Sequence, residues 1–398
     1  MGKTNDSFER AFFYFYALMK IVTIIGARPQ IIKAAALSRA VREFPHPIEE
    51  IIVHTGQHYD PNMSDVFFGE LGIPQPNYNL GVGSGSHGKQ TASIISGIED
   101  ILLSEKPDFL VVYGDTNSTL AAAIAGSKIH VPIVHIEAGL RSFNKKMPEE
   151  VNRILCDHVS TLLFSPTPTG FTNLLNEGFK ESSAPFTSDN PGIFQCGDLM
   201  YDNSLYFSKV AESKTTISNR LELDSKPFIL ATIHRNNNTD EPERLNALFG
   251  VLMDLAEESG VRILLPLHPR TRKMLNDLLT PALQEQLKRG WLELIEPASF
   301  LEMIVLEQKA EMVITDSGGV QKEAYFFEKP CIILRPETEW VELVQNGTAQ
   351  ICDADPMKIR AAFEYYMNKS NLLRFPAVFG DGKAAHFILN EMYKNLQA

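Results

Sequence analysis

The chain has 398 residues, of which 44% are hydrophobic, and a formal net charge of -12. That length accommodates two domains, and the hydrophobic content is ordinary for a globular protein, although no apolar run is long enough to span a bilayer. The negative charge argues against nucleic acid or an anionic membrane surface as the main partner, because both attract basic proteins.

The first 18 residues are predicted to form an N-terminal extension. Residues 11–19 are mostly apolar, but no small-residue cleavage site follows them, as a secretory leader requires. Because an apolar strand begins almost at once, at Ile21, we expect Met19 to be the functional start.

Short β-branched runs alternate with longer amphipathic stretches along the remainder of the chain. This alternation predicts βαβ units and parallel sheets covered by helices on both faces. Residues 180–192, rich in Ser, Pro, Asp and Asn, interrupt the series, so we predict two doubly wound, Rossmann-like α/β domains. The predicted strands are 21–25, 51–54, 109–113, 133–136 and 162–165, then 228–233, 262–265, 292–295, 312–315 and 331–334.

Residues directly after each strand are the candidates for a site, because ligands bind beyond the carboxyl ends of such strands. After the first strand, Gly26 permits a tight turn and Arg28 offers a planar fork to a pyrophosphate. Lys33 follows one turn later, where a solvated surface lysine is the alternative. Polar residues that could line the same cleft follow the second strand: His54, Gln57 and His58.

Two motifs resemble ligand sites without completing them. Residues 83–90 nearly spell a phosphate-binding P-loop, but Gln90 stands where Ser or Thr would hold magnesium, and no buried strand precedes the motif. Asp353 and Asp355 resemble a metal-binding pair, yet they directly precede Pro356 and a helical stretch. A helix cap is therefore the better interpretation of that pair.

Three carboxylates follow strand ends or begin a helix in the first half. Asp115 follows the third strand, where capping the next helix is its alternative role, and Glu137 directly follows the fourth, where an unpaired buried carboxylate is costly. Glu149 begins a helix, and a favourable helix-start charge paired with Arg153 is its alternative role. Together they could supply general acids and bases on opposite faces of a substrate.

Cationic or donor groups follow two strands of the second half. His234 and Arg235 come after one strand, and His268 and Arg270 come after the next. In an acidic protein such pairs indicate a local anion site, although either histidine alone could be structural.

Residues 315–323 (Thr-Asp-Ser-Gly-Gly-Val-Gln-Lys-Glu) mark a transition from strand to helix. Ser317, Gly318 and Gly319 would let phosphate oxygens approach the backbone N–H groups at the helix N-terminus, where the helix dipole favours negative charge. Glu323, about one and a half turns on, is placed to accept a hydrogen bond from a sugar hydroxyl. The alternative is that Ser317 caps the helix and the glycines form a tight turn.

In combination and in order, these motifs resemble the non-hydrolysing UDP-N-acetylglucosamine 2-epimerase family from about Met19 to the C-terminus. The resemblance implies the two-domain fold shared with GT-B glycosyltransferases, with a UDP-sugar in the interdomain cleft. The implied parts are an extension (1–18), an N-terminal catalytic domain (19–190), a C-terminal UDP-binding domain (191–378) and a helix returning to the first domain (379–398). The motifs are Gly-Ala-Arg-Pro at 26–29 with Lys33, His-Thr-Gly-Gln-His at 54–58, Gly-Asp-Thr at 114–116, 135–141, Pro-Glu-Glu at 148–150 with Asn152 and Arg153, and 315–323.

The resemblance also implies a reaction in which the proton on sugar C2 is removed as UDP leaves C1. Re-addition to the resulting glycal, with protonation from the other face, inverts C2 without a metal or nicotinamide cofactor. The proton-transfer candidates it implies are Asp115, Glu137 and Glu149, with Lys33 as a catalytic-site lysine and His234 as a further catalytic residue. The diphosphate is assigned to Arg28, His234, Ser317, Gly318 and Gly319, the ribose to Glu323, and other substrate contacts to Gln57, His58, Arg141, His268 and Arg270.

The chain departs from the family pattern at Trp340. Many members carry Thr-Glu-Arg-Pro there, whereas residues 338–342 read Thr-Glu-Trp-Val-Glu, which is more similar to the branch acting on UDP-2,3-diacetamido-2,3-dideoxyglucuronate. That nucleotide is the alternative substrate to UDP-N-acetylglucosamine. Asp60 also replaces a second glutamine that follows the Gln57 position in allosterically activated members.

Two other function classes share parts of this pattern. A GT-B glycosyltransferase would need one base and an acceptor site rather than three carboxylates, and a catalytically silent UDP-sugar-binding protein would be expected to lose Asp115 or Glu137. The resemblance further implies a homodimer that supplies precursors of bacterial surface polysaccharides. Four cysteines without metal or disulfide spacing indicate a reduced, cytoplasmic protein: Cys156, Cys196, Cys331 and Cys352.

Overall fold

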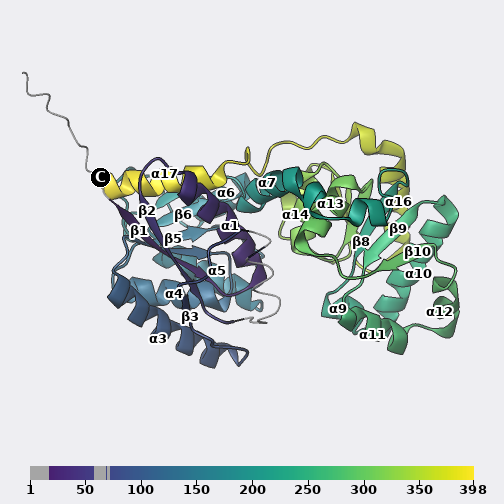
Figure 1. The fold of residues 1–398 in the computed structure, drawn as a ribbon, viewed down its shortest axis with the longest axis horizontal. Coiled ribbons are helices and arrows are strands. Elements are labelled where there is room, and N and C mark those ends of the chain that lie inside the picture. The colour runs from purple at the N-terminus through teal and green to yellow at the C-terminus, as the bar shows by residue number, and fades with distance from the viewer. Residues whose placement is uncertain (1–17, 58–68, 70–71) are drawn as a thin grey trace, which may run out of the picture.

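The computed structural model describes residues 18–57, 69 and 72–398, and in them the strands pair into two parallel sheets (Figure 1). The first sheet has the strand order β3-β2-β1-β4-β5-β6-β7. Its strands are β1 (Met19–Ile25), β2 (Ile48–His54), β3 (Tyr78–Asn79), β4 (Phe109–Tyr113), β5 (Ile133–Ile136), β6 (Leu162–Ser165) and β7 (Gly192–Gln195). Its connecting helices are α1 (Arg28–Glu43), α3 (His87–Glu105), α4 (Asn117–Lys128), α5 (Pro148–Val159) and α6 (Pro168–Asn176).

The second sheet has the order β10-β9-β8-β11-β12-β13. Its strands are β8 (Phe228–Thr232), β9 (Arg262–Pro266), β10 (Leu292–Ile295), β11 (Met312–Thr315), β12 (Cys331–Ile333) and β13 (Ala349–Ile351). The helices of this half are α7 (Leu199–Lys214), α8 (Ile217–Arg220), α9 (Asn236–Thr239), α10 (Pro242–Ser259), α11 (Pro269–Leu278), α12 (Pro281–Leu287), α13 (Phe300–Lys309), α14 (Gly318–Phe326), α15 (Val341–Gln345), α16 (Pro356–Lys369), the short 3-10 helix η1 (Ser370–Leu372) and α17 (Ala384–Gln397). The two Rossmann-like α/β domains predicted from the sequence are therefore present. No helix of the described residues is both long and apolar enough to cross a membrane.

Both faces of the first sheet are covered, as β1 illustrates. Ile21 and Ile25 pack into an apolar cluster with α1, whereas Val22 and Ile24 pack into a separate cluster with α3 and α4. Burial on both faces explains why β1 is a continuous β-branched run rather than an alternating one.

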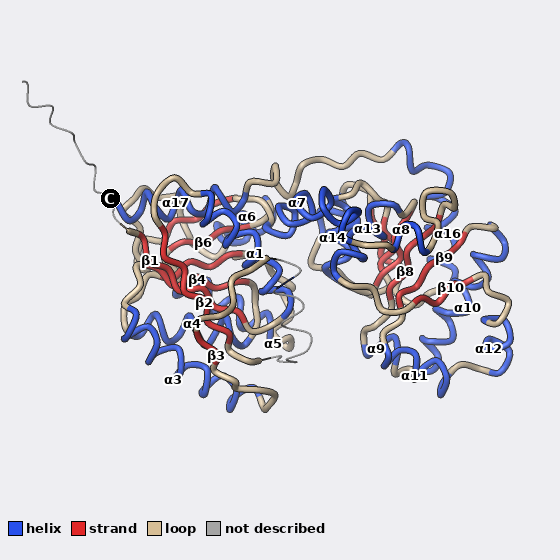
Figure 2. The backbone as a smooth tube through the Cα atoms, in the orientation of Figure 1, coloured by secondary structure: helices blue, strands red, loops and turns tan. Residues whose placement is uncertain are grey.

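Helix α7 joins the two domains by apolar packing. It packs against α1 on one side and α13 and α14 on the other, so one apolar cluster runs through both halves. Phe207 of α7 meets Phe300 of α13 edge to face, with ring centroids 5.2 Å apart. The loop after η1 then carries the chain back to α17, which lies along α1 (Figure 2). Phe387 of α17 contacts Phe164.

The strand order reverses once in each sheet, between β1 and β4 and between β8 and β11. Loops leaving neighbouring strands in opposite directions at such a point open a crevice at the carboxyl ends of the strands. The residues that follow these four strands include all the phosphate candidates and Asp115.

Some local features differ from the sequence expectations. Strand β7 pairs with β6, so the first sheet extends to Gln195. Asp355 caps α16 as predicted, accepting from the Met357 N–H at 2.9 Å, and Asp353 pairs with Arg244. The expected N-terminal extension lies outside the described residues except for Leu18.

Candidate active site

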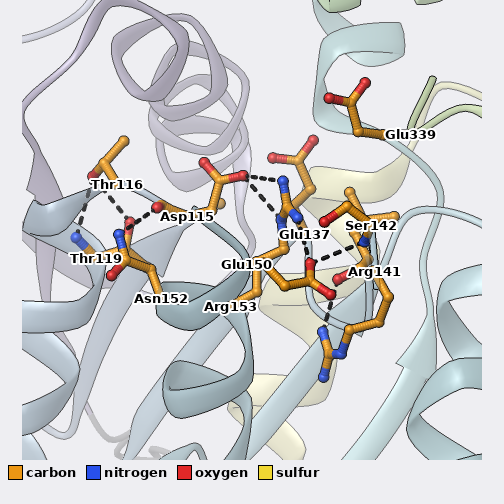
Figure 3. Close-up of polar contacts among 12 residues, drawn as sticks. Asp115, Thr116, Thr119, Glu137, Arg141, Ser142, Glu150, Asn152, Arg153 and Glu339 are labelled. Carbon is orange, nitrogen blue, oxygen red and sulfur yellow. Dashed lines mark hydrogen bonds and ion pairs between the residues drawn. The ribbon is translucent and has the colours of Figure 1, made fainter. Parts of the chain in front are cut away.

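Asp115 lies at the carboxyl end of β4 and is held from two directions by α5 (Figure 3). Arg153 places Nε 3.0 Å and Nη2 2.7 Å from its Oδ2, and Asn152 donates to its backbone carbonyl at 2.8 Å. A third of the Asp115 side chain reaches solvent, yet its burial raises its pKa. The charge of Arg153 lowers that pKa and the charge of Glu137 raises it, so the pKa remains above its ordinary value. Asp115 is thus oriented and holds a proton more readily than an ordinary aspartate.

The helix spacing predicted a pair between Arg153 and Glu149, but Arg153 pairs with other carboxylates. Its Nη1 donates instead to Glu150 at 2.8 Å, three residues away, while its other nitrogens contact Asp115. Glu149 is exposed at the start of α5 and lines a pocket of about 310 Å³ together with Asp115 and Gln57. The two candidate carboxylates therefore share one cavity.

Glu137 follows β5 with a backbone φ of 75° and forms ion pairs with two lysines. Lys33 of α1 contacts its Oε2, and Lys322 of α14 lies 3.4 Å from its Oε1. Burial alone would raise the pKa of Glu137, but the two lysines lower it to about 2. Glu137 is therefore a fixed anion at neutral pH.

The turn between β4 and Asp115 depends on Gly114 and on a buried histidine. Gly114 has a φ of 62°, and a Cβ there would lie only 3.0 Å from Oε2 of Glu137. His135 places Nε2 2.8 Å from the Gly114 carbonyl and Nδ1 2.6 Å from Asp157. Burial opposes charge on this ring, but neighbouring groups that include Asp157 raise the pKa of His135, so it donates at both nitrogens and fixes the turn.

In the second domain, Ser317 caps α14, accepting from the Val320 N–H at 3.4 Å, so its capping role is confirmed. The alternative role for the glycines is wrong, because both lie within α14 rather than in a tight turn. The atom nearest to a Cβ on Gly318 would be Nη1 of Arg335, at 3.6 Å, and for Gly319 the nearest would be 3.9 Å away. Protein packing therefore does not require glycine at either position. A ligand bound close to the helix start would require it.

Asp316 orients the loop after β8. It is fully buried and accepts from the backbone N–H groups of His234 and Arg235, each at 3.0 Å, while Nδ1 of His234 lies 3.0 Å from its other oxygen. Although burial opposes it, these hydrogen bonds lower the pKa of Asp316. The His234 side chain is half exposed, so its imidazole is fixed by Asp316 and still reaches solvent.

Lys322 joins the two domains, and the sequence analysis gave it no role. Its Nζ lies 2.5 Å from Oδ2 of Asp198, 3.4 Å from Glu137 and 4.1 Å from the centroid of the Trp340 ring. The side chain is buried, and burial is outweighed by the two carboxylates, which raise the pKa of Lys322. Its spacing of four residues from Gly318 places it on the same helix face, and that signal was available in the sequence.

Other candidates divide into those near this site and those engaged elsewhere. Arg28 and Glu323, from different domains, lie close enough for Arg28 to favour the ionised form of Glu323. Gln57 accepts from the N–H and hydroxyl of Ser118 at 3.0 and 2.7 Å, at the wall of the Asp115 pocket. His58 and Asp60 lie outside the described residues.

Arg141, His268 and Arg270 are engaged with other groups of the protein. The Arg141 guanidinium is almost fully buried between Asp157 and Glu177, at 2.7 and 2.6 Å, and so supports the turn under Glu137. Arg270 is paired with Asp240 at 2.6 Å, and His268 accepts from the Arg270 N–H at the start of α11. In the described part of the chain no three His, Cys, Asp or Glu side chains are grouped so as to hold a metal ion.

Comparison with known proteins places these features in context. Residues 40–392 match the family model described as UDP-N-acetylglucosamine 2-epimerase. The chain is 49% identical to a UDP-N-acetylglucosamine 2-epimerase homolog of Methanococcus maripaludis, covering 95% of this chain and 100% of the relative. It is 50% identical to the UDP-2,3-diacetamido-2,3-dideoxy-D-glucuronate 2-epimerase of Pseudomonas aeruginosa, covering 83% and 87%. The solved structure of Methanocaldococcus jannaschii UDP-GlcNAc 2-epimerase in complex with UDP-GlcNAc and UDP is 40% identical, with a TM-score of 0.80, and the match covers 94% of this chain and 100% of that one.

Proposed function

The chain belongs to the UDP-N-acetylglucosamine 2-epimerase family, and from that premise we propose that it interconverts UDP-N-acetylglucosamine and UDP-N-acetylmannosamine by inverting sugar C2. The observation that carries the proposal is that Lys322 lies where two chemically different groups of residues meet, one from each domain. Carboxylates with displaced pKa values lie on one side, and an open helix start with cationic neighbours lies on the other.

Asp115 and Glu149 are the proposed proton carriers. As the C1–O bond breaks, one carboxylate takes the C2 proton, the C2–H electron pair forms the C1=C2 bond of a glycal, and UDP keeps the pair of the broken bond. UDP then adds back to C1 while the other side chain, which begins the step as the protonated carboxylic acid, donates its proton to C2 from the opposite face. The raised pKa of Asp115 supports this role, because a general base works best when its pKa approaches the working pH.

Glu137 and Lys33 have a different proposed role. An anion with a pKa of about 2 is a weak proton acceptor, so we assign Glu137 to keeping Lys322 charged and to holding both Lys33 and Lys322 in position. Those ammonium groups are placed to offset the negative charge that develops as the diphosphate leaves.

The second domain is proposed to hold UDP. The diphosphate would lie at the N-terminus of α14, where Gly318 and Gly319 leave room and where the amide dipoles favour an anion. Arg28 and His234 would neutralise it from the sides, and Glu323 would accept from the ribose hydroxyls.

One observation favours a second candidate substrate, UDP-2,3-diacetamido-2,3-dideoxyglucuronate. Trp340 places Nε1 3.9 Å from the Cβ position of Gly318 and packs its ring on Lys322, so the departure from the family pattern lies inside the site. The Pseudomonas relative named for that nucleotide is 50% identical. A sugar with an added carboxylate would be attracted by the positive charge of Lys322 beside Trp340.

Turnover of the two nucleotides, measured side by side under identical conditions, tests the proposal. We expect the manno epimer from UDP-N-acetylglucosamine with the larger kcat/KM. Epimerisation of the diacetamido nucleotide alone would establish the second candidate, and no reaction of either would refute both.

The cellular setting is also proposed. The four cysteines are unpaired, which suits the reducing cytoplasm, where nucleotide sugars for surface polysaccharides are made. The homodimer stays a prediction.

A further inference from the structure

Glu150 is a buried carboxylate of α5 that the proposed reaction does not use, and 1% of its side chain is exposed. Its Oε2 accepts from the Ser142 N–H at 2.9 Å and from Nη1 of Arg153 at 2.8 Å (Figure 3). Its Oε1 accepts from the Phe143 N–H at 2.8 Å. Burial raises the pKa of Glu150, but these hydrogen bonds hold it below its ordinary value, so Glu150 is an anion at neutral pH.

Arg153 connects Glu150 to Asp115. Its Nη1 donates to Glu150, while its Nε and Nη2 lie 3.0 and 2.7 Å from Oδ2 of Asp115 (Figure 3). Because the guanidinium is planar and rigid, a contact on one of its edges sets the direction of the other. Only 6% of the Arg153 side chain reaches solvent, so an Nη1 without an acceptor would cost free energy there. The Glu150 carboxylate therefore determines where the guanidinium meets Asp115.

The same carboxylate also fixes the loop between β5 and α5. Phe143 in that loop has a φ of 57°, in the left-handed region that such a residue rarely adopts, and it is 80% exposed. Core packing of the ring therefore does not hold this conformation, whereas the two N–H groups bonded to Glu150 do. Glu150 thus has a structural role in the loop beside its contact with Arg153.

We propose that Glu150 is a positioning residue for proton transfer at C2, which holds the Arg153 guanidinium in place so that Arg153 in turn orients the Asp115 carboxylate. The inference rests on the proposed function, in which Asp115 carries the C2 proton. Without Glu150, the guanidinium would turn toward water and its two contacts with Asp115 would be lost.

Groups from three elements set the charge of Asp115. Burial and the charge of Glu137, which follows β5, raise its pKa, whereas Arg153 of α5 and Lys33 of α1 lower it. A guanidinium that leaves Asp115 must therefore raise that pKa. Loss of the Glu150 charge with Arg153 still in place has the opposite sign, because removing a nearby anion lowers the pKa of a carboxyl group.

Glu150→Leu removes every acceptor from this position. We expect kcat for C2 epimerisation to fall by about tenfold to 10²-fold, because a small misplacement of a reacting group has an effect of about that size. The acid limb of kcat/KM, which is the fall in rate as Asp115 becomes protonated, should move to higher pH. UDP affinity, measured by calorimetry, should not change, because the proposed UDP contacts are intact.

Glu150→Gln separates the contact with Arg153 from the contact with the loop. Its one amide oxygen satisfies more donors at the Oε2 position, where it accepts from both Ser142 and Arg153, and its amide nitrogen then faces the Phe143 N–H. The acid limb should therefore stay at the wild-type pH or below it. A limb that rises as far as in Glu150→Leu would assign the effect to the loop and overturn the proposal.

Glu302→Leu in the second domain is the matched control. Glu302 also accepts from a backbone N–H, that of Ser299 at 3.0 Å, and from an arginine, Arg220 at 3.1 Å. Its loss should lower stability without changing kcat or the acid limb. The same shift in this variant would show that the readout follows stability and would overturn the proposal.

Asp115→Asn separates the two possible failures. If this variant keeps C2 exchange, Asp115 does not carry the proton, and both its proposed role and this inference are wrong. If it loses exchange but Glu150→Leu keeps the wild-type kcat and acid limb, or moves the limb to lower pH, the inference alone is overturned.

Glu150→Asp covers the case in which Glu150→Leu does not fold. It keeps the negative charge, but its carboxylate ends one methylene short of Arg153. The acid limb should again move to higher pH, and a limb at the wild-type pH would contradict the proposal.

Discussion

The carboxyl ends of the two sheets have the same topology and opposite chemistry. Beyond β4 and β5, the first sheet presents carboxylates whose charge is set by partners: Arg153 for Asp115, Lys33 and Lys322 for Glu137. Beyond β8 and β11, the second sheet presents N–H groups, an imidazole and a glycine helix start. The difference teaches that a switch point supplies only a crevice, and that the residue types after the strands decide between proton transfer and anion binding.

The largest expected effect is a loss of C2 exchange without a loss of UDP affinity. Asp115→Asn removes the proposed proton acceptor, so C2 exchange should fall by about 10²–10⁴-fold. UDP affinity should stay within about twofold, because the second domain is unchanged. Exchange is followed by NMR and affinity by calorimetry, and a loss of UDP binding instead would make Asp115 structural.

Lys322→Met tests the bridge between the two regions. Removing this buried cation leaves Asp198 and Glu137 without one of their partners, and the free energy of unfolding should fall by about 3–5 kcal/mol. Lys288→Met, which removes an exposed pair with Glu285, is the control and should change stability little. Equal effects in denaturant unfolding would show that the bridge contributes nothing.

Gly318→Ala breaks the binding side alone. A Cβ there meets protein atoms only at 3.6 Å or beyond, but it would occupy the approach of the diphosphate, so UDP affinity should fall by about tenfold or more. Stability should not decrease, since alanine favours helices. Gly250→Ala in α10, where the nearest atom is 3.5 Å away, should leave UDP affinity unchanged. Equal affinities for both variants would count against a diphosphate site at the N-terminus of α14.

The smallest expected effect is a difference between Asp115 and Glu137 in how they influence the pH dependence of kcat/KM. Asp115 must be ionised to accept a proton, so kcat/KM should fall as pH drops through its pKa, which lies above the ordinary 3.8. Glu137→Gln should lower the rate and shift that acid limb to lower pH, because it removes a charge that raises the pKa of Asp115. A limb that disappears or moves to higher pH in this variant would contradict the assignment.

Glu137 should also leave a signature in stability. Its pKa is lowered from 4.5 to about 2, so its ion pairs stabilise the fold above pH 4.5 and lose that contribution as the pH falls toward 2. The stability difference between wild type and Glu137→Gln should therefore shrink across this range in thermal unfolding.

The central strands were predictable because burial on both faces makes them uniform apolar runs. β4, β5 and β6 begin and end at the predicted residues. The strands β3, β7 and β13 were not predicted: β3 and β13 have only two and three residues, and β7 directly follows the Ser- and Pro-rich residues 180–192.

For the candidate site, position along the chain identified residues but not their partners. Asp115, Glu137 and Ser317 were found because each follows a strand. That Arg153 contacts Asp115 rather than Glu149, and that Lys322 contacts Glu137 across the domains, depends on the packing of α5 and α14, which no local pattern encodes.

The proposed division of labour between the two sheets requires that the C2 proton leave the sugar while UDP stays bound. Incubation of the protein with UDP-N-acetylglucosamine in D2O, without an acceptor, tests this most directly. The account predicts deuterium at C2 of both the gluco and the manno nucleotide. Formation of the epimer without deuterium at C2, or neither exchange nor epimer, would contradict it.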